Sequence, residues 1–498
     1  MKRVESAVNS RRRALIALSS APLVLSACGG GSDDDEPSGE IRNVTATTKV
    51  FDAYHQLAAV IVEYNEDVVA PDKTAYSVVD SITPSLRDDF MRWPVSSEHP
   101  VTAVYTNSQP ATRADKSSVA GRYVVIELKP TSSSLPANSS GVNMLEHSAS
   151  MATMRTTAST DLCDYWRTDW SKLVITQRAA VKRASGTVVV PEGTTVPTLK
   201  FENIADAEVK RFTQKVFLNA QGHSVHYSLY LPPNYSSSRS YPLFFYVTGN
   251  GGRLNYLQTD ANGNFYNLGG ALTRDRFGIA ATQLPEDAIV VVPQLWRNAP
   301  ASWSNNNATD AIALIENLLG RYSINRARVY AAGSSIGTFI LSEVLATRSD
   351  LISAYLMFNG RFTGSSSAFA TADSAILTNK DIAYINALPR VPKDTAWLAA
   401  NAAVMSGIVA KRLPVRIYHG VNDQTISSTG GGVTTYEALV ALYKAQGLGD
   451  TEIANLVKLT LIEDPAFLSM GVSERHASVP VSIKTYPELF TWALAIGK

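Results

Sequence analysis

Cysteine is nearly absent from this chain of 498 residues, which contains only Cys28 and Cys163. Cys28 lies in a segment that we expect to be processed during export, as described below. The one remaining thiol has no partner for an internal disulfide. We interpret Cys163 as a small core residue, so the composition excludes a disulfide-stapled scaffold and does not favour a catalytic thiol.

A surplus of charge of either sign is also missing. The chain has 45 Lys and Arg against 44 Asp and Glu, a formal net charge of +1. Binding to a phosphate backbone needs clustered basic residues, so we expect no nucleic-acid partner. Three of the seven histidines, His55, His99 and His147, lie in the β-rich first part of the chain, and their spacing is not typical of a metal site. We expect neither a metal nor an organic cofactor.

Long apolar runs are missing after residue 30, so that part of the chain predicts no transmembrane helix. Residues 1–28 differ, because a basic stretch precedes the apolar run ALIALSSAPLVLSA and then Cys28. This order predicts an export signal. Its ending resembles a bacterial lipoprotein lipobox, which implies lipidation of Cys28. The run SRRRAL partly resembles a twin-arginine signal, and the twin-arginine and general secretion routes both stay open.

Residues 29–43 are predicted to form a flexible acidic tether, because GGGSDDDEPSGE lacks the apolar side chains that a core requires. Removal of residues 1–27 takes away five basic residues and one acidic residue, which changes the formal charge from +1 to −3. We therefore expect an exported lipoprotein that is held to a membrane through Cys28. Its place would be the bacterial cell envelope, at the outer membrane or the periplasmic face, or outside the cell.

Residues 44–204 read as short strands separated by polar loops. Five runs rich in β-branched and aromatic residues carry this pattern, at 58–64, 101–106, 122–128, 172–177 and 186–191. Strands at this spacing without intervening helices are typical of a β-sandwich. No catalytic constellation is visible in this part.

Residues 205–498 show a different pattern, in which apolar strands alternate with helices. The predicted strands are 223–232, 241–249, 288–294, 328–333 and 414–420, and the predicted helices are 308–322, 336–347 and 395–411. Nearly continuous apolar strands are typical of parallel strands buried on both faces. The pattern predicts a doubly wound α/β domain.

The stretch VYAAGSSIGTFI contains the candidate nucleophile. Gly-x-Ser-x-Gly fits only with Ser335 at the centre, flanked by Gly333 and Gly337. A nucleophile elbow requires tiny residues two positions before and after the serine, since strand and helix pack closely there. With Ser334 at the centre, Ile336 would crowd the turn. We predict that Ser335 is the nucleophile.

A serine hydroxyl needs a base, and the base needs an acid to orient it. In the chain order Ser, Asp or Glu, His, the acid follows a buried strand, and Asp423 in IYHGVNDQTI does so. His476 is then the histidine downstream of Asp423 and the candidate base. His419 is interpreted as a structural residue just beneath the acid. Glu463 and Asp464 remain alternative acids.

An oxyanion hole needs two aligned N–H donors. The amide of Ile336, directly after the nucleophile, is the first candidate. The glycine-rich segment VTGNGG follows a predicted strand, and the amide of Asn250 or Gly251 is the second.

These motifs resemble a known family. HSVHYSLYLPPNYSSSRSYPLFFYVTGNGG, AIVVVPQ, YSINRARVYAAGSSIG and IYHGVNDQTI resemble, in order, the polyhydroxybutyrate-depolymerase-like and feruloyl-esterase-like α/β-hydrolases. The β-rich N-terminal part, with GRYVVIELKP, is similar to the Ig-like domain of bacterial EstA-type esterases. Thr248 stands where that family has a histidine, Ile336 where it often has Met, and Ala477 where it often has an aromatic residue.

The resemblance implies that Ser335, Asp423 and His476 hydrolyse carboxylic esters through an acyl-enzyme. The expected substrates are short-chain or aryl and hydroxycinnamoyl-type esters, either small molecules or polymers. The alternatives are a serine peptidase of the same fold, a polyhydroxyalkanoate depolymerase, or a surface lipoprotein that binds a partner without catalysis. The sequence does not give the oligomeric state.

Overall fold

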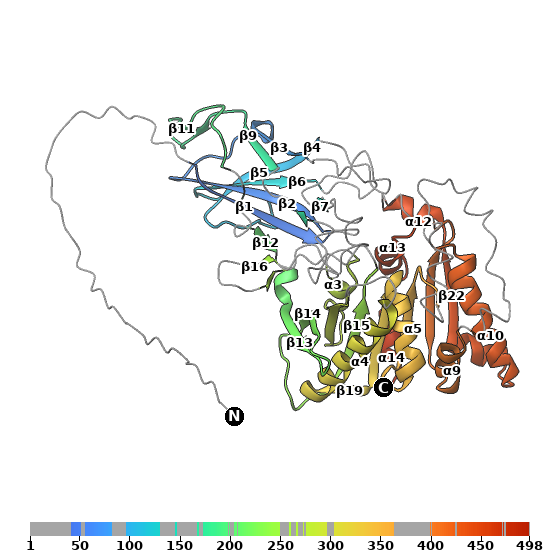
Figure 1. Ribbon diagram of the computed structural model, residues 1–498. Coiled ribbons are helices and arrows are strands. Elements are labelled where there is room, and N and C mark those ends of the chain that lie inside the picture. Colours follow the sequence, from blue (N-terminus) through green and yellow to red (C-terminus); the bar gives the residue numbers. More distant parts are fainter. Residues whose placement is uncertain are drawn as a thin grey trace, which may run out of the picture.

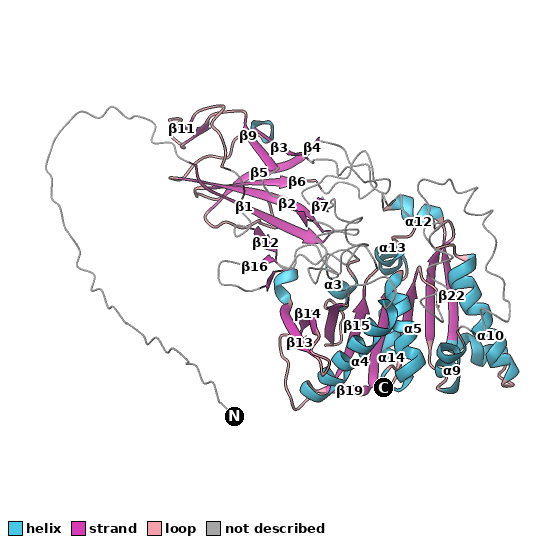
Figure 2. Ribbon diagram, viewed as in Figure 1, coloured by secondary structure: helices cyan, strands magenta, loops and turns pink. Residues whose placement is uncertain are grey.

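The computed structural model of the protein describes residues 41–50, 55–81, 96–129, 145–146, 167–168, 173–197, 199, 204–206, 208–249, 258–259, 265–266, 272, 275–295, 303–362, 399, 401–423, 426–470, 472 and 475–497. Figures 1 and 2 show a strand-rich N-terminal part and a C-terminal part in which strands and helices alternate. We call the described residues up to 206 the N-terminal domain and those from 208 the C-terminal domain. Cys28 and Cys163 lie outside the described residues.

Two largely antiparallel sheets build most of the N-terminal domain. The larger has the order β12-β1-β2-β6-β5, in which only β12 and β1 are parallel, and the smaller has the order β4-β3-β9. Their strands are β12 (Ile204–Asp206), β1 (Ile41–Val50), β2 (His55–Tyr64), β6 (Tyr123–Leu128), β5 (Val101–Asn107), β4 (Ser96–His99), β3 (Tyr76–Ser81) and β9 (Leu173–Gln177). Two further strand pairs are short: β7 (Leu145–Glu146) with β8 (Arg167–Thr168), and β10 (Val181–Lys182) with β11 (Val188–Val190).

The two sheets share one hydrophobic core, as a sandwich requires. In β9, Leu173 and Ile175 are buried while Val174 and Thr176 between them are exposed. These inward residues pack in the same cluster as Val60 and other side chains of the five-stranded sheet. The alternation buries one face of each sheet and leaves the other outward. The predicted β-sandwich is confirmed.

One eight-stranded sheet forms the centre of the C-terminal domain, in the order β13-β14-β18-β15-β19-β20-β21-β22. Its strands are β13 (Thr213–Leu218), β14 (Ser224–Tyr230), β18 (Ile289–Gln294), β15 (Tyr241–Val247), β19 (Ile324–Ser334), β20 (Ala354–Phe358), β21 (Val415–Gly420) and β22 (Val457–Ile462). From β18 to β22 all neighbours are parallel, whereas β13, β14 and β18 pair antiparallel. Numbered in chain order, the strands run 1-2-4-3-5-6-7-8 across the sheet. The sheet is therefore mixed, and β13, β20 and β22 add to the strands that the sequence predicted.

Helices cover both faces of this sheet. The strand β15 shows why, because Phe245 and Val247 point into one core cluster while Phe244 and Tyr246 point into the other. On the first face lie α4 (Trp303–Arg321), α5 (Ile336–Arg348), α9 (Ala402–Ala410), α10 (Thr434–Ala445) and α11 (Asp450–Leu456). On the second lie α3 (Phe277–Ala281), α12 (Asp464–Ser469), α13 (Ser478–Thr485) and α14 (Glu488–Ala495).

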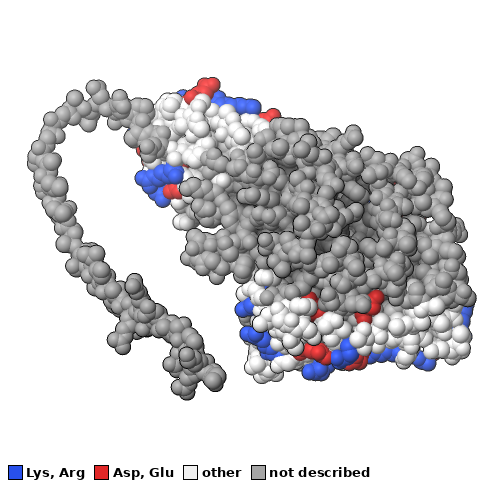
Figure 3. All heavy atoms as spheres, viewed as in Figure 1, with Lys and Arg blue, Asp and Glu red and all other residues white. Residues whose placement is uncertain are grey.

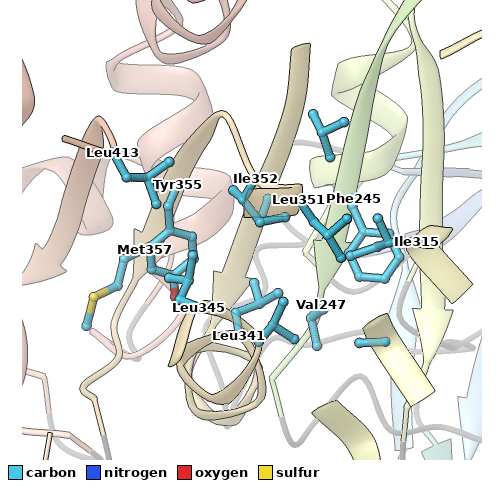
Figure 4. Close-up of a cluster of buried hydrophobic side chains, with 14 of the residues drawn as sticks. Phe245, Val247, Ile315, Leu341, Leu345, Leu351, Ile352, Tyr355, Met357 and Leu413 are labelled. Atoms are coloured by element: carbon cyan, nitrogen blue, oxygen red, sulfur yellow. The ribbon is translucent and has the colours of Figure 1, made fainter. Parts of the chain in front are cut away.

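Large apolar side chains pack between α5 and the sheet. Leu341 and Leu345 of this helix meet Phe245, Val247 and Tyr355 of the strands (Figure 4). Burial of a side chain of this size removes most of its apolar surface from water. This stabilises the fold by about 1.5–3 kcal/mol per side chain. This packing holds the start of α5, and therefore the turn before it, against the sheet.

The chain passes from the N-terminal domain core to the C-terminal domain core between Asp206 and Val209. The strand β12 ends at Asp206 and pairs with β1, whereas Val209 belongs to a C-terminal core cluster. The strand β1 begins at Ile41, within the predicted tether of residues 29–43.

No helix among the described residues is long and apolar enough to cross a membrane. On the face shown in Figure 3, basic and acidic side chains lie intermixed over the lower part of the C-terminal domain.

Candidate active site

Three polar side chains follow three neighbouring parallel strands. Ser335 comes directly after β19, Asn359 after β20, and Asp423 three residues after β21. The carboxyl ends of parallel strands meet at the same edge of a sheet, where ligands of open α/β folds bind. His476 lies two residues before α13, which packs on this sheet.

Ser335 has the backbone of a nucleophile elbow. Its φ is +52° and its ψ is −123°, and it stands between the last residue of β19 and the first of α5. A non-glycine residue with positive φ is strained unless its surroundings hold it there. Two hydrogen bonds do so: the Ser335 N–H donates to Phe358 O (3.0 Å), and the Thr338 N–H donates to Ser335 O (2.9 Å).

The two glycines beside Ser335 are required by space. A Cβ on Gly337 would lie 2.1 Å from Val247 O, and a Cβ on Gly333 would lie 2.9 Å from Leu341 Cδ1 and 3.0 Å from Gly337. The helix therefore touches the strand backbone at this turn. Ser334 and Ser335 are buried to a similar degree, 5% and 6% exposed. The backbone, rather than burial, places Ser335 at the tip of the elbow.

Asp423 binds the ring of His476. The His476 Nδ1 lies 2.8 Å from Asp423 Oδ2 and 3.0 Å from Oδ1. A carboxylate only accepts hydrogen bonds, so the ring proton is on Nδ1 and the lone pair is on Nε2. This is the tautomer that a general base toward a serine hydroxyl requires. The His476 side chain is 12% exposed and the Asp423 side chain is fully buried.

The Asp423 carboxylate is supported on both oxygens. Asn359 Nδ2 donates to Oδ2 at 2.8 Å, and the Ile426 N–H donates to Oδ1 at 3.0 Å. Burial alone would raise the pKa of Asp423. The positive charge that the nearby His476 ring carries when protonated, and hydrogen bonds from His419 and His476, outweigh it, so this pKa lies well below its usual range. The carboxylate is therefore ionised at neutral pH.

His419 is fully buried directly against the acid. Its Nε2 lies 2.8 Å from Ile426 O and 3.2 Å from Asp423 Oδ2, and its Nδ1 accepts from the Gly432 N–H at 3.2 Å. These contacts put the ring proton on Nε2. A Cβ on Gly432 would lie 2.9 Å from this ring, so the glycine-rich turn closes around the histidine. His419 thus lies where the sequence predicted it, beneath the acid.

The alternative acids have other positions. Asp464 accepts from Arg475 Nε at 2.8 Å, and Glu463 is the residue directly before α12, with no capping hydrogen bond from its side chain. The carboxylate on His476 Nδ1 is that of Asp423. Asp464 therefore binds Arg475, the residue before His476, and not the His476 ring.

Part of the expected oxyanion hole lies within the described residues. Ile336 is the first residue of α5, and the first N–H groups of a helix have no partner within it. Gly249 lies close by, since a Cβ on it would be 3.0 Å from Ser335 Cβ. Asn250 and Gly251, the other candidate donors, lie outside the described residues.

Among the described residues, no group of three or more His, Cys, Asp or Glu side chains is placed to hold a metal ion. The arrangement that is present orients the His476 ring on Asp423 and can stabilise a cation on that ring.

Comparison with known proteins identifies the fold. The family model described as "Esterase Ig-like N-terminal domain" matches residues 43–190. A solved structure described as "Crystal Structure of a Thermostable Esterase" is 16% identical with a TM-score of 0.58, covering 92% of this chain and 100% of that one. The fold is that of the α/β-hydrolases, with an Ig-like domain before it.

Weaker similarities concern part of the chain. Est1E from Butyrivibrio proteoclasticus is 14% identical with a TM-score of 0.36, over 57% of this chain and 99% of that one. The acylaminoacyl peptidase of Pyrococcus horikoshii is 12% identical with a TM-score of 0.36, over 57% of this chain and 42% of that one. No sequence among curated proteins matches.

Asn359 is a buried residue of this site that the sequence did not predict. Its Nδ2 donates to Asp423 Oδ2 and to Arg475 O at 2.7 Å, and its Oδ1 accepts from the Gly420 N–H at 3.3 Å. It therefore joins the acid loop to the histidine loop. The one signal in the sequence is the Asn-Gly pair after AYLMF, since Asn tolerates the left-handed backbone that it adopts here (φ +43°).

Proposed function

We propose that the protein is a serine carboxylic-ester hydrolase that works through an acyl-enzyme. One observation carries this proposal. The His476 ring is fixed by Asp423 in the tautomer of a general base, and Ser335 stands in a strained elbow at the sheet edge from which the Asp423 loop also emerges. Buried, hydrogen-bonded strain of this kind is typical of catalytic positions.

The steps follow from these roles. His476 Nε2 takes the proton of the Ser335 hydroxyl as its oxygen attacks the ester carbonyl, and Asp423 stabilises the imidazolium that forms. The cation then gives the proton to the leaving alcohol, which leaves an ester between the acyl group and Ser335. Water deprotonated by His476 releases the acid and restores the serine.

The negative charge on the carbonyl oxygen requires donors during both additions. We assign one to the N–H of Ile336, where the dipole of the thirteen-residue helix α5 also favours a negative charge. The second belongs to the segment that begins at Gly249, which lies against Ser335. Asn250 and Gly251 are the candidates.

The proposed substrates are short-chain or aryl and hydroxycinnamoyl-type esters. Support comes from the resemblance of residues 223–252 to feruloyl-esterase-like proteins and from the match to an esterase-associated Ig-like domain. The peptidase and polyester alternatives share the same three residues, so substrates must separate them.

The test compares residues 29–498, which contain every described residue, with the Ser335→Ala variant. Both are assayed on p-nitrophenyl esters of increasing acyl length, a hydroxycinnamate methyl ester, a polyhydroxyalkanoate film and a peptide anilide. Ester turnover that disappears in Ser335→Ala is the expected result. Ester turnover that is unchanged in Ser335→Ala refutes the mechanism. Turnover of the peptide anilide alone would indicate a peptidase. An Arg326→Ala variant, which changes an exposed residue near the start of β19 and away from the elbow, is the matched control.

We also propose export as a lipoprotein anchored through Cys28 in the bacterial cell envelope. The basic and apolar order of residues 1–28 supports this. The full chain expressed in a bacterium with labelled palmitate should incorporate the label, and Cys28→Ala should not. Equal labelling of both chains would contradict the proposal.

A further inference from the structure

A second buried polar cluster lies beside the nucleophile elbow, and none of the proposed chemical steps uses it. It consists of Asp275, Tyr246, Thr248 and Ser334, and we call it the Asp275 network. The four residues are 8%, 0%, 0% and 5% exposed. A buried carboxylate is costly unless hydrogen bonds compensate for its lost hydration. Its position therefore requires an explanation.

Hydrogen bonds join Asp275 to the strand that precedes the oxyanion segment. Asp275 Oδ2 accepts from the Tyr246 hydroxyl and from Thr248 Oγ1, the latter at 2.7 Å. Tyr246 is the penultimate residue of β15, and Thr248 follows the strand directly. Burial and the neighbouring Asp275 charge raise the pKa of Tyr246 well above its usual range, so this hydroxyl stays protonated and donates.

The same network reaches the residue before the nucleophile. The side chain of Ser334 lies near Tyr246 and slightly offsets the rise in the Tyr246 pKa, and β15 and β19 are paired with Val247 opposite Gly333. The backbone carbonyls of Val247 and Thr248 also lie against Gly337, where a Cβ would be 2.1 and 2.8 Å from their oxygens. Thr248 is thus held between the Asp275 carboxylate on one side and the start of α5 on the other.

The next residue along the chain is Gly249, which borders Ser335. A Cβ on Gly249 would be 3.0 Å from Ser335 Cβ, 3.4 Å from Ser334 O and 3.6 Å from Ser334 Oγ. A shift of Thr248 therefore moves the start of the oxyanion segment relative to the attacking oxygen. A displacement of about 1 Å in such a site can lower a rate about 100-fold.

We propose that Asp275, acting through Thr248 and Tyr246, is a positioning residue that sets the oxyanion segment at Gly249 against Ser335. This inference rests on the proposed hydrolase function and deepens it. Asp275 touches no reacting atom in this role. It holds the strand end from which the second oxyanion donor emerges, so its loss should weaken binding of the tetrahedral intermediate more than binding of the ester.

The test uses residues 29–498 with Thr248→Val, which keeps the shape and loses the donor, and Thr248→Ser, which restores the donor. Asp275→Asn is the second arm. Tyr330→Phe is the matched control, since its buried hydroxyl donates to Ile496 O at 2.8 Å, away from the elbow. For each protein, kcat and KM on a p-nitrophenyl ester are measured with the thermal midpoint. Inhibition by a trifluoromethyl ketone, which forms a tetrahedral adduct with the serine, is measured as well.

Thr248→Val and Asp275→Asn should lower kcat about 10- to 100-fold with KM changed by less than about 2-fold. The ketone should bind more weakly by the same factor, and Thr248→Ser should recover most of the loss. Tyr330→Phe should lower the thermal midpoint without changing kcat per active site. Active-site titration with a fluorophosphonate normalises every rate to folded enzyme.

Two results would overturn the inference. One is Thr248→Val with kcat and ketone affinity equal to the wild type after normalisation. The other is a loss in Thr248→Val that Tyr330→Phe reproduces, which would make the network only a source of stability. The proposed function is refuted if the wild type shows no ester turnover that depends on Ser335. That result is known before any network variant is compared. In that case the present inference falls with it.

Discussion

Replacement of Asn359 tests whether one amide group holds two parts of the site together. Asn359 is fully buried and makes three polar contacts, donating to Asp423 and to Arg475 O and accepting from the Gly420 N–H. In Asn359→Ala, the Arg475 carbonyl and the Gly420 N–H each lose a buried hydrogen-bond partner. Each such loss costs about 1 kcal/mol or more, and the bond to the charged Asp423 costs about 1.5–3 kcal/mol.

The backbone adds a separate contribution. Asn359 has φ +43°, a conformation that costs a residue with a Cβ about 1–2 kcal/mol and glycine almost nothing. We therefore expect Asn359→Ala to lower the free energy of unfolding by about 4–6 kcal/mol and Asn359→Gly by about 1 kcal/mol less. Both should lower kcat about 10- to 100-fold, because Asp423 and the His476 loop lose their common support.

The assay is urea unfolding followed by circular dichroism, combined with kcat and KM on a p-nitrophenyl ester at low denaturant. Asn359→Asp is a third variant of nearly the same shape, and its carboxylate would face that of Asp423. It should be the least active of the three at neutral pH. The reasoning is wrong if Asn359→Gly keeps the wild-type kcat and urea midpoint. Equal stability of the alanine and glycine variants would refute the backbone contribution alone.

Three further outcomes are expected. Gly337→Ala should abolish ester turnover, because its Cβ would lie 2.1 Å from Val247 O; a fluorophosphonate label that still attaches to Ser335 would contradict this. Asp423→Asn should lower kcat about 10³- to 10⁴-fold with little change in KM, since His476 loses the partner that fixes its tautomer; a loss below 10-fold would argue for another acid. The pKa of Asp423 is lowered in the folded protein, so its stabilising contribution is complete above the unfolded pKa of about 4 and is lost as the pH falls through the folded value. The difference in unfolding free energy between the wild type and Asp423→Asn should shrink as the pH falls below about 4, and a difference that grows over that range would show the opposite sign.

The apolar runs predicted most of the centre of the sheet, although the buried strand β20 (AYLMF) was missed. Residues 241–249, 288–294 and 328–333 lie in β15, β18 and β19, where burial on both faces leaves almost no polar position. The strand β22 (VKLTLI) mixes polar and apolar residues because it lies at the edge of the sheet. The strand β13 (TQKVFL) does so at the other edge. Edge strands follow no simple pattern, and the sequence did not predict either one.

Gly-x-Ser-x-Gly pointed to Ser335 because the constraint is local, within five residues of one turn. Asn359 and Asp275 could not be found in this way. Asn359 bonds partners 61 to 116 residues away, and Asp275 bonds partners 27 and 29 residues away. Only the folded sheet brings these groups together, so their roles depend on tertiary structure rather than on a motif.

The turn TGGGV at Thr429–Val433 links the order of the site to one buried run of glycines. Of its three consecutive glycines, Gly431 and Gly432 lie close to His419, which lies against Asp423. Glycine loses more backbone freedom on ordering than any other residue, and that entropic cost grows with temperature. Burial and the hydrogen bonds of the turn offset this cost in the folded protein. We therefore expect any change that loosens this turn, such as replacement of Gly432, to free the His419 ring from Asp423 and to lower activity even where the two cores stay folded.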